Sequence, residues 1–426
     1  MTIGREIHNL ASELWPICRS ITGNGVRQTL KIIKQHLPQL QTFEVPTGTQ
    51  CFDWTVPKEW NIKDAYVIDP NGKKIIDFKV SNLHVVGYSI PIDQKLPLSE
   101  LKKHLYTLPD QPNAIPYITS YYSPHWGFCL THSQFEQLID GEYHVVIDSE
   151  LKEGHLTYAE LLIPGKSEKE VFLSTYVCHP SLANNELSGP TVTTFLAKWL
   201  LSQENLNYSY RIIFIPETIG SLTYLSQHAD TMKQRVFAGY NVTCVGDERD
   251  YSYIPSRAEN TLSDMIARHV LGHIAPNYKT YPFFESGSDE RRYCAPGIDL
   301  PIASIMRTKY NRYPEYHTSL DDLTLVTPKG LEGGYEAIRK CLEIIEHNEV
   351  LKLTVMCEPQ LGKRGLYPNL STKQSNQIVS NMMNFISYCD GSLSTLEIAQ
   401  KIQVPIWDLY DIIANLKQEG LLIKAN

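Results

Sequence analysis

The feature that most constrains the fold is a regular alternation of strand-like and helix-like segments between residue 166 and about residue 350. The apolar run "VFLSTYVC" precedes the amphipathic stretch "PTVTTFLAKWLLSQ", and "YRIIFIPE" precedes "SLTYLSQHADTMKQ". A chain that alternates in this way forms an α/β domain around a largely parallel sheet. Ligands of such sheets bind beyond the carboxyl ends of the strands, so polar residues that directly follow a strand are the first candidates for chemistry.

A chain of 426 residues is longer than one hydrophobic core usually serves, so more than one domain is expected. The remaining segments have different sequence patterns. Residues 1–40 carry two helical patterns and are assigned, with residues 166–355, to the same α/β domain. Residues 41–165 are short β-rich runs broken by turn signals such as "DPNGKK", which predicts an inserted β-rich lid domain. Residues 356–426 have a helix–turn–helix rhythm that ends in an apolar stretch, which predicts a winged helix.

Charge and cysteine usage narrow the class of protein. The formal net charge is −8, whereas nucleic-acid binding needs clustered lysine and arginine. The nine cysteines are scattered without a C-x-x-C pair, which is typical of reduced thiols in a reducing compartment. The N-terminus lacks the apolar core of a signal peptide, and no run of about 18 apolar residues is present. We therefore expect a cytoplasmic protein with no membrane partner.

Four polar clusters follow predicted strands or lie in loops beside them. They are "CHPSLANNELSG" with His179, "IPETIGS" with Glu217, "CVGDERDY" with Asp247, and "YPEYHTSLDDL" with His317. Imidazoles and carboxylates bind Zn²⁺, and a free carboxylate takes a proton from zinc-bound water. Each residue alone also has an ordinary explanation, since a histidine after a strand is often structural, Glu217 can cap a helix and Asp247 can stabilise a turn.

The order of these motifs resembles the co-catalytic zinc aminopeptidases typified by bacterial leucyl aminopeptidases. The resemblance covers roughly residues 1–40 and 166–350 and includes "HTSLDDL" and "GSDERRYCAPGIDLPIAS". The whole chain is more similar to a less characterised family that has an aminopeptidase-like domain interrupted by a lid and a C-terminal winged helix. Its members are often described as associated with polysaccharide biosynthesis. The stretches "PICRSITGNGVRQTL", "TSYYSPHWGFCLT" and "CHPSLANNELSGP" carry this similarity.

The resemblance assigns roles to the residues at the strand ends. His179 and Asp247 fall on one zinc position, His317 falls on the other, and Glu217 falls on the general base. The implied fold is a mixed sheet flanked by helices, like that of the zinc aminopeptidases, and the implied cofactor is zinc.

Two departures from the family pattern bear on the number of zinc ions. Asn185 stands at the bridging aspartate, and Thr218 stands at the glutamate ligand that follows the base. Two cations with a neutral bridge between them repel each other strongly. We therefore expect one zinc ion, bound by His179, Asp247 and His317, with Asn185 or Glu186 contributing. A metal-free and inactive domain is the alternative.

Four further residues are candidates for contacts with a substrate: Arg19, Trp126, Arg291 and Tyr316. Arg19 precedes a helix N-terminus that can hold an anionic group. Trp126 lies in an aromatic lid stretch, and in "DERRY" either Arg291 or its neighbour Arg292 can bind a carboxylate. Tyr316 lies in the "YPEYHTSLDDL" motif. A plain helix start, a small lid core and solvated arginines are the alternative explanations.

The resulting hypothesis is a zinc-dependent hydrolase of aminopeptidase type that cleaves a peptide or small amide, with Glu217 as general base. One alternative is a regulator that binds DNA, and another is a non-catalytic scaffold in a carbohydrate pathway. Residues 372–426 contain four lysines and five acidic residues, whereas a groove-reading helix is basic. We therefore expect no DNA partner and a winged helix used for packing or for homo-oligomer formation.

Overall fold

The computed structural model describes residues 2–366 and 373–425, and the chain forms two compact units. The first unit comprises Met1–Asp264 and Tyr278–Glu336, and the second comprises Met265–Asn277 and Ala337–Asn426. The first unit contains the α/β domain and the β-rich insert. The second contains the C-terminal helices and a small sheet.

The first unit is built on an eight-stranded sheet with the order β1-β10-β12-β11-β13-β16-β14-β15. These strands span Gln41–Pro46, His155–Ile163, Tyr208–Ile215, Ser167–Tyr176, Val236–Asn241, Ile302–Met306, Ser252–Ile254 and Lys279–Thr280 in that order. The four central strands, β12, β11, β13 and β16, are parallel, whereas β1 and β10 add antiparallel edge strands and β14 runs antiparallel to β16. The expected mixed α/β sheet is confirmed.

The central strands are buried on both faces, which explains their nearly continuous apolar sequences. All residues of β11 from Glu170 to Tyr176 are buried. Val171 pairs with Tyr210 of β12, and Leu173 pairs with Tyr240 of β13. The polar segment after Tyr176 therefore begins at the carboxyl edge of the sheet, next to the end of β12.

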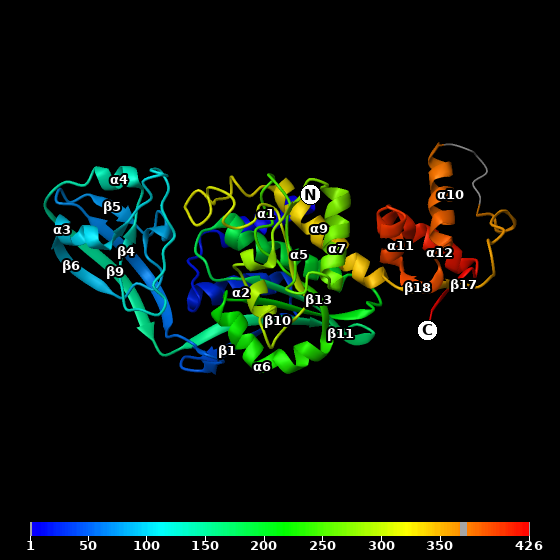
Figure 1. Cartoon of the computed structure of the whole chain (residues 1–426). Coiled ribbons are helices and arrows are strands. Elements are labelled where there is room, and N and C mark those ends of the chain that lie inside the picture. The colour runs from blue at the N-terminus through cyan, green and yellow to red at the C-terminus, as the bar shows by residue number, and fades with distance from the viewer. Residues whose placement is uncertain (1, 367–372, 426) are drawn as a thin grey trace. The chain divides into compact units, whose positions relative to one another are not determined.

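Helices cover the two faces of this sheet. α5 (Ser188–Leu201) and α6 (Ile219–Arg235) pack against β11 from opposite faces (Figure 1). α1 (Ile3–Leu14) and α2 (Asn24–His36) pack on α5, and the short α8 (Glu290–Tyr293) packs beside α6. Two longer helices, α7 (Leu262–Ile274) and α9 (Pro328–His347), each cross a boundary between the two units in sequence.

The β-rich insert lies between β1 and β10 in the chain. Its four-stranded antiparallel sheet has the order β5-β4-β9-β6, and two short pairs, β2-β3 and β7-β8, accompany it. These elements span Lys74–Asp77, Glu59–Ile68, Glu142–Lys152, Ile92–Pro97, Gln50–Cys51, Trp54–Thr55, Leu105–Tyr106 and Phe128–Cys129, with helices α3 (Leu98–Leu101) and α4 (His132–Glu136). The strands at both ends of the expected 41–165 segment, β1 and β10, pair within the main sheet instead.

The second unit contains the winged helix. Its sheet has the order β18-β17-β19, formed by Asp390–Ser394, Val350–Leu353 and Leu422–Lys424. Its helices are α10 (Lys373–Ile386), α11 (Thr395–Lys401) and α12 (Tyr410–Gln418). A capping box between Ser394 and Glu397 begins α11. The unit starts before residue 356, because β17 precedes that position.

In the part of the chain that the structure describes, no helix combines the length and the apolar character that a bilayer crossing requires.

Candidate active site

The candidate site begins where β11 ends. The chain leaves the strand at Tyr176, passes through Cys178, His179 and Pro180, and enters a π-helical turn at Ala183–Leu187 that leads into α5. Single π-helical turns are frequent at functional sites. His179 is buried in this loop.

A buried carboxylate fixes the orientation of His179. Glu186 Oε2 accepts hydrogen bonds from the backbone N–H of His179 over 3.1 Å and, in the matching tautomer, from its Nδ1 over 2.9 Å. Arg19 lies on the other side, with its Nε 3.3 Å from Glu186 Oε1. Burial raises the pKa of Glu186 to about 8, and the Arg19 guanidinium opposes this rise. The hydrogen bond at Nδ1 leaves Nε2 of His179 free to face outward.

That outward face opens into a cavity of about 390 Å³. His179 Nε2 lies 3.9 Å from Glu217 Oε2, and the rings of His179 and His317 are 5.8 Å apart between centroids. The cavity is lined by Ile21, Trp54, Tyr117, Thr119, Tyr121, Tyr122, Cys178, His179, Glu217, Thr218, Ile219, Arg292 and His317. Both expected histidines and the expected base therefore line one cavity.

Glu217 follows β12 directly. Its backbone N–H lies 3.2 Å from Cys178 Sγ, and its Oε1 accepts a hydrogen bond from Ser288 Oγ over 2.6 Å. Burial, followed by the negative charge of Asp289, raises the pKa of Glu217 to about 8. The next residue, Thr218, has a φ of 62° and donates its N–H to Asp289 Oδ1 over 2.8 Å. The carboxylate is thus anchored at one oxygen and free at the other.

His317 is held between two tyrosines. Its ring stacks on Tyr316 at 3.9 Å and meets the edge of Tyr117 at 5.1 Å. The insert contributes Tyr117, whose backbone N–H donates to the carbonyl of His317 over 2.9 Å. Burial lowers the pKa of both His179 and His317 to about 3, so both imidazoles are neutral near pH 7. A neutral imidazole is the form that binds a metal.

Asn185 lies behind the cavity rather than on its wall. Its backbone N–H donates to Asp321 Oδ2 over 3.0 Å, and the Tyr176 hydroxyl lies 3.0 Å from its Oδ1. Thr243 Oγ1 contacts the carbonyl of Asn185 over 3.3 Å.

The carboxylate of Asp247 is hydrogen-bonded to residues outside the cavity. Its two oxygens accept hydrogen bonds from Arg249 N, Thr308 N, Thr308 Oγ1 and Asn184 Nδ2. A carboxylate with four donors has few lone pairs left for a metal. Asp247 does not line the cavity. The structure therefore does not bring this expected ligand to the two histidines.

The four expected substrate residues lie outside the cavity wall. Arg19 is 1% exposed and donates to the carbonyls of His179 and Pro180, so it supports the site from behind. Trp126 stacks on His104 inside the insert, and Arg291 binds the carbonyl of Ser286. Tyr316 supports the ring of His317.

The cavity wall includes residues that the sequence analysis did not single out. Trp54 and Tyr117 come from separate parts of the insert. Of the two arginines that the sequence analysis offered, Arg292 lines the cavity and Arg291 does not. Tyr121 and Tyr122 belong to the aromatic stretch that was expected to cover a substrate, and both line the cavity. The tyrosines near Trp126 in the sequence indicated an aromatic surface in the insert. The sequence did not show which of these rings face the histidines.

Comparison with known proteins places the chain in a family. The model of a domain family of unknown function, DUF4910, matches residues 8–348, and a winged helix-turn-helix model matches residues 349–424. The chain belongs to the DUF4910 family. A Clostridium acetobutylicum protein, provisionally named a polysaccharide biosynthesis protein with an aminopeptidase-like domain, is 48% identical over 400 residues. That match covers 93% of this chain and 91% of the relative.

Solved structures agree with the fold of the DUF4910 domain. The crystal structure of a provisionally named peptidase from Clostridium acetobutylicum has a TM-score of 0.93 at 45% identity, with 99% of this chain and 96% of that chain covered. A zinc aminopeptidase from Bacillus subtilis has a TM-score of 0.59 at 11% identity, with 80% and 95% covered. The expected resemblance to zinc aminopeptidases is confirmed at the level of the fold.

The DUF4910 domain has two sets of potential metal ligands around His179. Within residues 2–366 and 373–425, one cluster of three potential ligand side chains lies within 4.8 Å: Cys178, His179 and Glu186. This cluster surrounds the Nδ1 side of the ring, where the Arg19 guanidinium repels a cation and burial raises the pKa of Cys178 well above its usual range. The cavity side instead presents His179 Nε2, His317 and Glu217, which are donor types that zinc uses in catalytic sites. The cavity side therefore offers the donor types of a zinc site, but the ligand atoms of His179, His317 and Glu217 do not all lie within 4.8 Å of one another.

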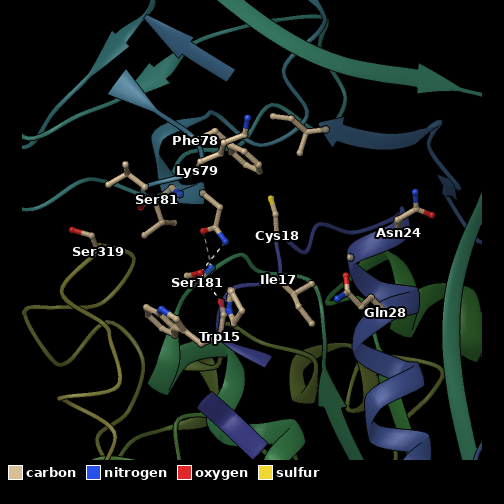
Figure 2. Close-up of a pocket in the computed structure, with 16 residues that line it drawn as sticks. Trp15, Ile17, Cys18, Asn24, Gln28, Phe78, Lys79, Ser81, Ser181 and Ser319 are labelled. Carbon is tan, nitrogen blue, oxygen red and sulfur yellow. Dashed lines mark hydrogen bonds between the residues drawn. The ribbon is translucent and has the colours of Figure 1, made fainter. Parts of the chain in front are cut away.

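A second cavity of the DUF4910 domain, about 550 Å³ in volume, lies between the insert and the N-terminal helices. Figure 2 shows its wall, which includes Trp15, Cys18, Lys79, Ser181 and Ser319. The side chain of Asn82 is hydrogen-bonded to Ser181 through both of its polar atoms. Histidine and carboxylate side chains are missing from this described wall, whereas the smaller cavity has both.

Proposed function

We propose that the DUF4910 domain is a peptidase-type hydrolase that cleaves a peptide or small amide bond. His179 and His317 would hold one zinc ion, and Glu217 would act as general base. The observation that carries this proposal is the 3.9 Å separation between Glu217 Oε2 and His179 Nε2 within one cavity. The similarity to zinc aminopeptidases supports the reaction class. The proposal leaves Asp247 out of the ligand set, because its oxygens are already bonded.

Each residue of the site would have its own role in hydrolysis. A zinc ion held by His179 and His317 would act as a Lewis acid, which lowers the pKa of a water molecule and polarises an amide carbonyl. Glu217 Oε2 takes the proton of that water and returns it to the leaving amine, while Ser288 holds the other oxygen of the carboxylate. Glu186 keeps Nε2 of His179 directed at the cavity. Tyr117 and Tyr121, joined by a hydrogen bond of 2.9 Å, exclude water from one side.

A non-catalytic scaffold is the second candidate, and one observation favours it. Asn185 and Thr218 carry no charge, so the cavity offers a single carboxylate beside two imidazoles. A site of this kind binds zinc more weakly than one with three strong ligands. Zinc content and turnover therefore separate the two candidates.

The decisive experiment measures zinc per chain by elemental analysis and then screens peptide and acyl-amide substrates with and without a chelator. We expect one zinc per chain in the wild type and loss of zinc in His179→Ala and His317→Ala. His144→Ala is the matched control, because His144 pairs with Asp93 on the surface of the insert. Glu217→Gln should keep zinc and lower turnover by about 10² to 10⁴. A chain that neither binds zinc nor hydrolyses an amide in excess zinc would support the scaffold.

For the winged helix we propose a role in packing or self-association rather than in DNA binding. Its α12 carries Asp411 and Lys417, which gives no net positive charge to the helix that would enter a groove. Fluorescence anisotropy with duplex DNA at low and high salt tests this. A tight, salt-sensitive affinity would contradict the proposal.

A further inference from the structure

We infer that the substrate is an amide whose amine side carries a carboxylate, and that Arg292 binds this carboxylate. The inference rests on the proposed function and specifies its substrate class. Among the described residues that line the cavity, Arg292 is the one arginine or lysine and Glu217 is the one carboxylate residue. The positions of these two side chains therefore determine whether the cavity binds the carboxylate end or the ammonium end of a substrate.

Arg292 is positioned to bind an anion. It lies in the short α8, and its Nη1 donates to the carbonyl of Ser288 over 3.0 Å, which anchors the half-buried guanidinium. Its Nε and Nη2 donate to no other residue that the structure describes. A guanidinium with two unused N–H groups matches a carboxylate in bidentate fashion. Its neighbour Arg291 is exposed and does not line the cavity.

A free α-ammonium group has no comparable partner in this cavity. Glu217 is committed to Ser288 and to the proposed proton transfer. The nearby carboxylates, Asp289 and Glu290, are fully buried and do not line the cavity. Asp289 Oδ1 accepts a hydrogen bond from Ser221 and Glu290 accepts one from Asn241, whereas Asp289 Oδ2 has no partner among the described residues. Zinc and Arg292 would both repel an ammonium group. A substrate with a free N-terminus is therefore disfavoured.

The aromatic side of the cavity suits the acyl part of such a substrate. Trp54 and Tyr122 meet edge to face with centroids 5.9 Å apart, and both are partly exposed. Their rings offer apolar area to an acyl chain or an apolar side chain. The substrate class is thus an N-acyl amino acid or a peptide whose C-terminal amino acid is released. Hydrolysis breaks the amide C–N bond, adds the water oxygen to the carbonyl carbon, and transfers a proton to the departing amino group.

The test compares three substrates on the zinc-loaded full chain: an N-acyl amino acid, the same compound as its C-terminal amide, and an aminoacyl anilide. We expect kcat/KM to be about 10- to 100-fold higher for the first, because a charge-assisted hydrogen bond distinguishes it. Arg292→Gln should remove this preference, Arg292→Lys should retain part of it, and Arg291→Gln should leave it unchanged. Faster hydrolysis of the anilide, or equal loss on all substrates in Arg292→Gln, would overturn the inference while leaving the hydrolase assignment intact.

A binding measurement separates this inference from the proposed function. In a thermal-shift titration with zinc present, the N-acyl amino acid should raise the Tm of the wild type and of Arg291→Gln but not that of Arg292→Gln. If this pattern holds without turnover of any amide, the hydrolase proposal fails and the carboxylate site stands. If the ligand stabilises Arg292→Gln as well as the wild type, the carboxylate site fails.

Discussion

The carboxylate of Glu186 accepts a hydrogen bond from Nδ1 of His179 over 2.9 Å, and both side chains are buried. Arg19 lies behind this pair, 3.3 Å from the other carboxylate oxygen. The three residues form a buried support that directs one imidazole nitrogen at the cavity. Orientation of this kind raises the basicity of a metal-binding histidine and fixes its tautomer.

Glu186→Gln should weaken zinc binding by about 10- to 100-fold, because an amide is a poorer acceptor for Nδ1–H than a carboxylate. The variant should also lose about 3 kcal/mol of the free energy of unfolding, since the buried Arg19 loses the acidic side chain that it contacts over 3.3 Å. Competition with a chelator measures the first effect, and urea unfolding measures the second. Glu204→Gln, an exposed site, is the control. Wild-type zinc affinity in Glu186→Gln would show that this support is not needed.

Much of the fold follows from local patterns in the sequence. The alternation of β11, α5, β12 and α6 was predictable because their periodicities differ within short windows. His179 and Glu217 meet because β11 and β12 are parallel neighbours and each residue follows its strand directly. The same reasoning placed β1 and β10 in the lid, because an alternating edge strand does not reveal which sheet it joins.

Contacts between distant segments were not predictable in the same way. Asp247 has the residue type of a zinc ligand, but Thr308 and Asn184 occupy its oxygens, and no local pattern connects these positions. Arg19 has the sequence context of an anion site at a helix start, yet Glu186 pairs with it in the interior. Burial by tertiary structure decides both cases.

The insert is tied to the loop of His179 by Asn82. Asn82 Nδ2 donates to Ser181 Oγ over 2.8 Å, and Ser181 N–H donates to Asn82 Oδ1 over 3.1 Å (Figure 2). Asn82→Ala should lower the free energy of local opening around Ser181 by about 1–3 kcal/mol, because the N–H of Ser181 loses its hydrogen-bond partner. Hydrogen exchange at Ser181 and in the Asn82–His84 turn should quicken accordingly. Asn71→Ala, in an exposed turn, is the control, and unchanged exchange in Asn82→Ala would contradict the role of the tie.

His269 should make the second unit sensitive to acid. Its Nε2 accepts the backbone N–H of Ile406 over 3.0 Å, and burial, helped by His273, lowers its pKa to about 4. An unfolded histidine titrates near pH 6.5, so the unfolded chain binds more protons between about pH 4 and 6.5. The contribution of neutral His269 to the free energy of unfolding is therefore complete above about pH 6.5 and is lost as the pH falls toward about 4. After discounting for solvent screening, the loss is about 1–2 kcal/mol.

Hydrogen exchange at Ile406 as a function of pH, corrected for its intrinsic rate, measures this loss. His269→Gln retains an acceptor for the N–H but does not titrate, so its protection should change less between pH 7 and pH 4.5. Parallel curves for the wild type and His269→Gln would assign the acid sensitivity to other groups.

Thr218 adopts a backbone conformation that a β-branched residue rarely takes. Its φ of 62° and ψ of −76° lie at the start of α6, between Glu217 and the first helical turn. Such strain costs about 1–3 kcal/mol, and glycine relieves it while adding about 0.5–1 kcal/mol of entropy to the unfolded state. Thr218→Gly should therefore raise the free energy of unfolding by about 1 kcal/mol.

Zinc binding should be unaffected by Thr218→Gly, because the proposed ligands are His179 and His317. Ser226→Gly is a matched control in the exposed interior of α6, where glycine should lower stability by about 0.5 kcal/mol. We therefore expect urea unfolding to show a higher free energy of unfolding for Thr218→Gly and a lower one for Ser226→Gly. A loss of stability in Thr218→Gly as large as that in Ser226→Gly would show that the left-handed backbone at Thr218 stores no strain, and a loss of zinc would place Thr218 in the metal site.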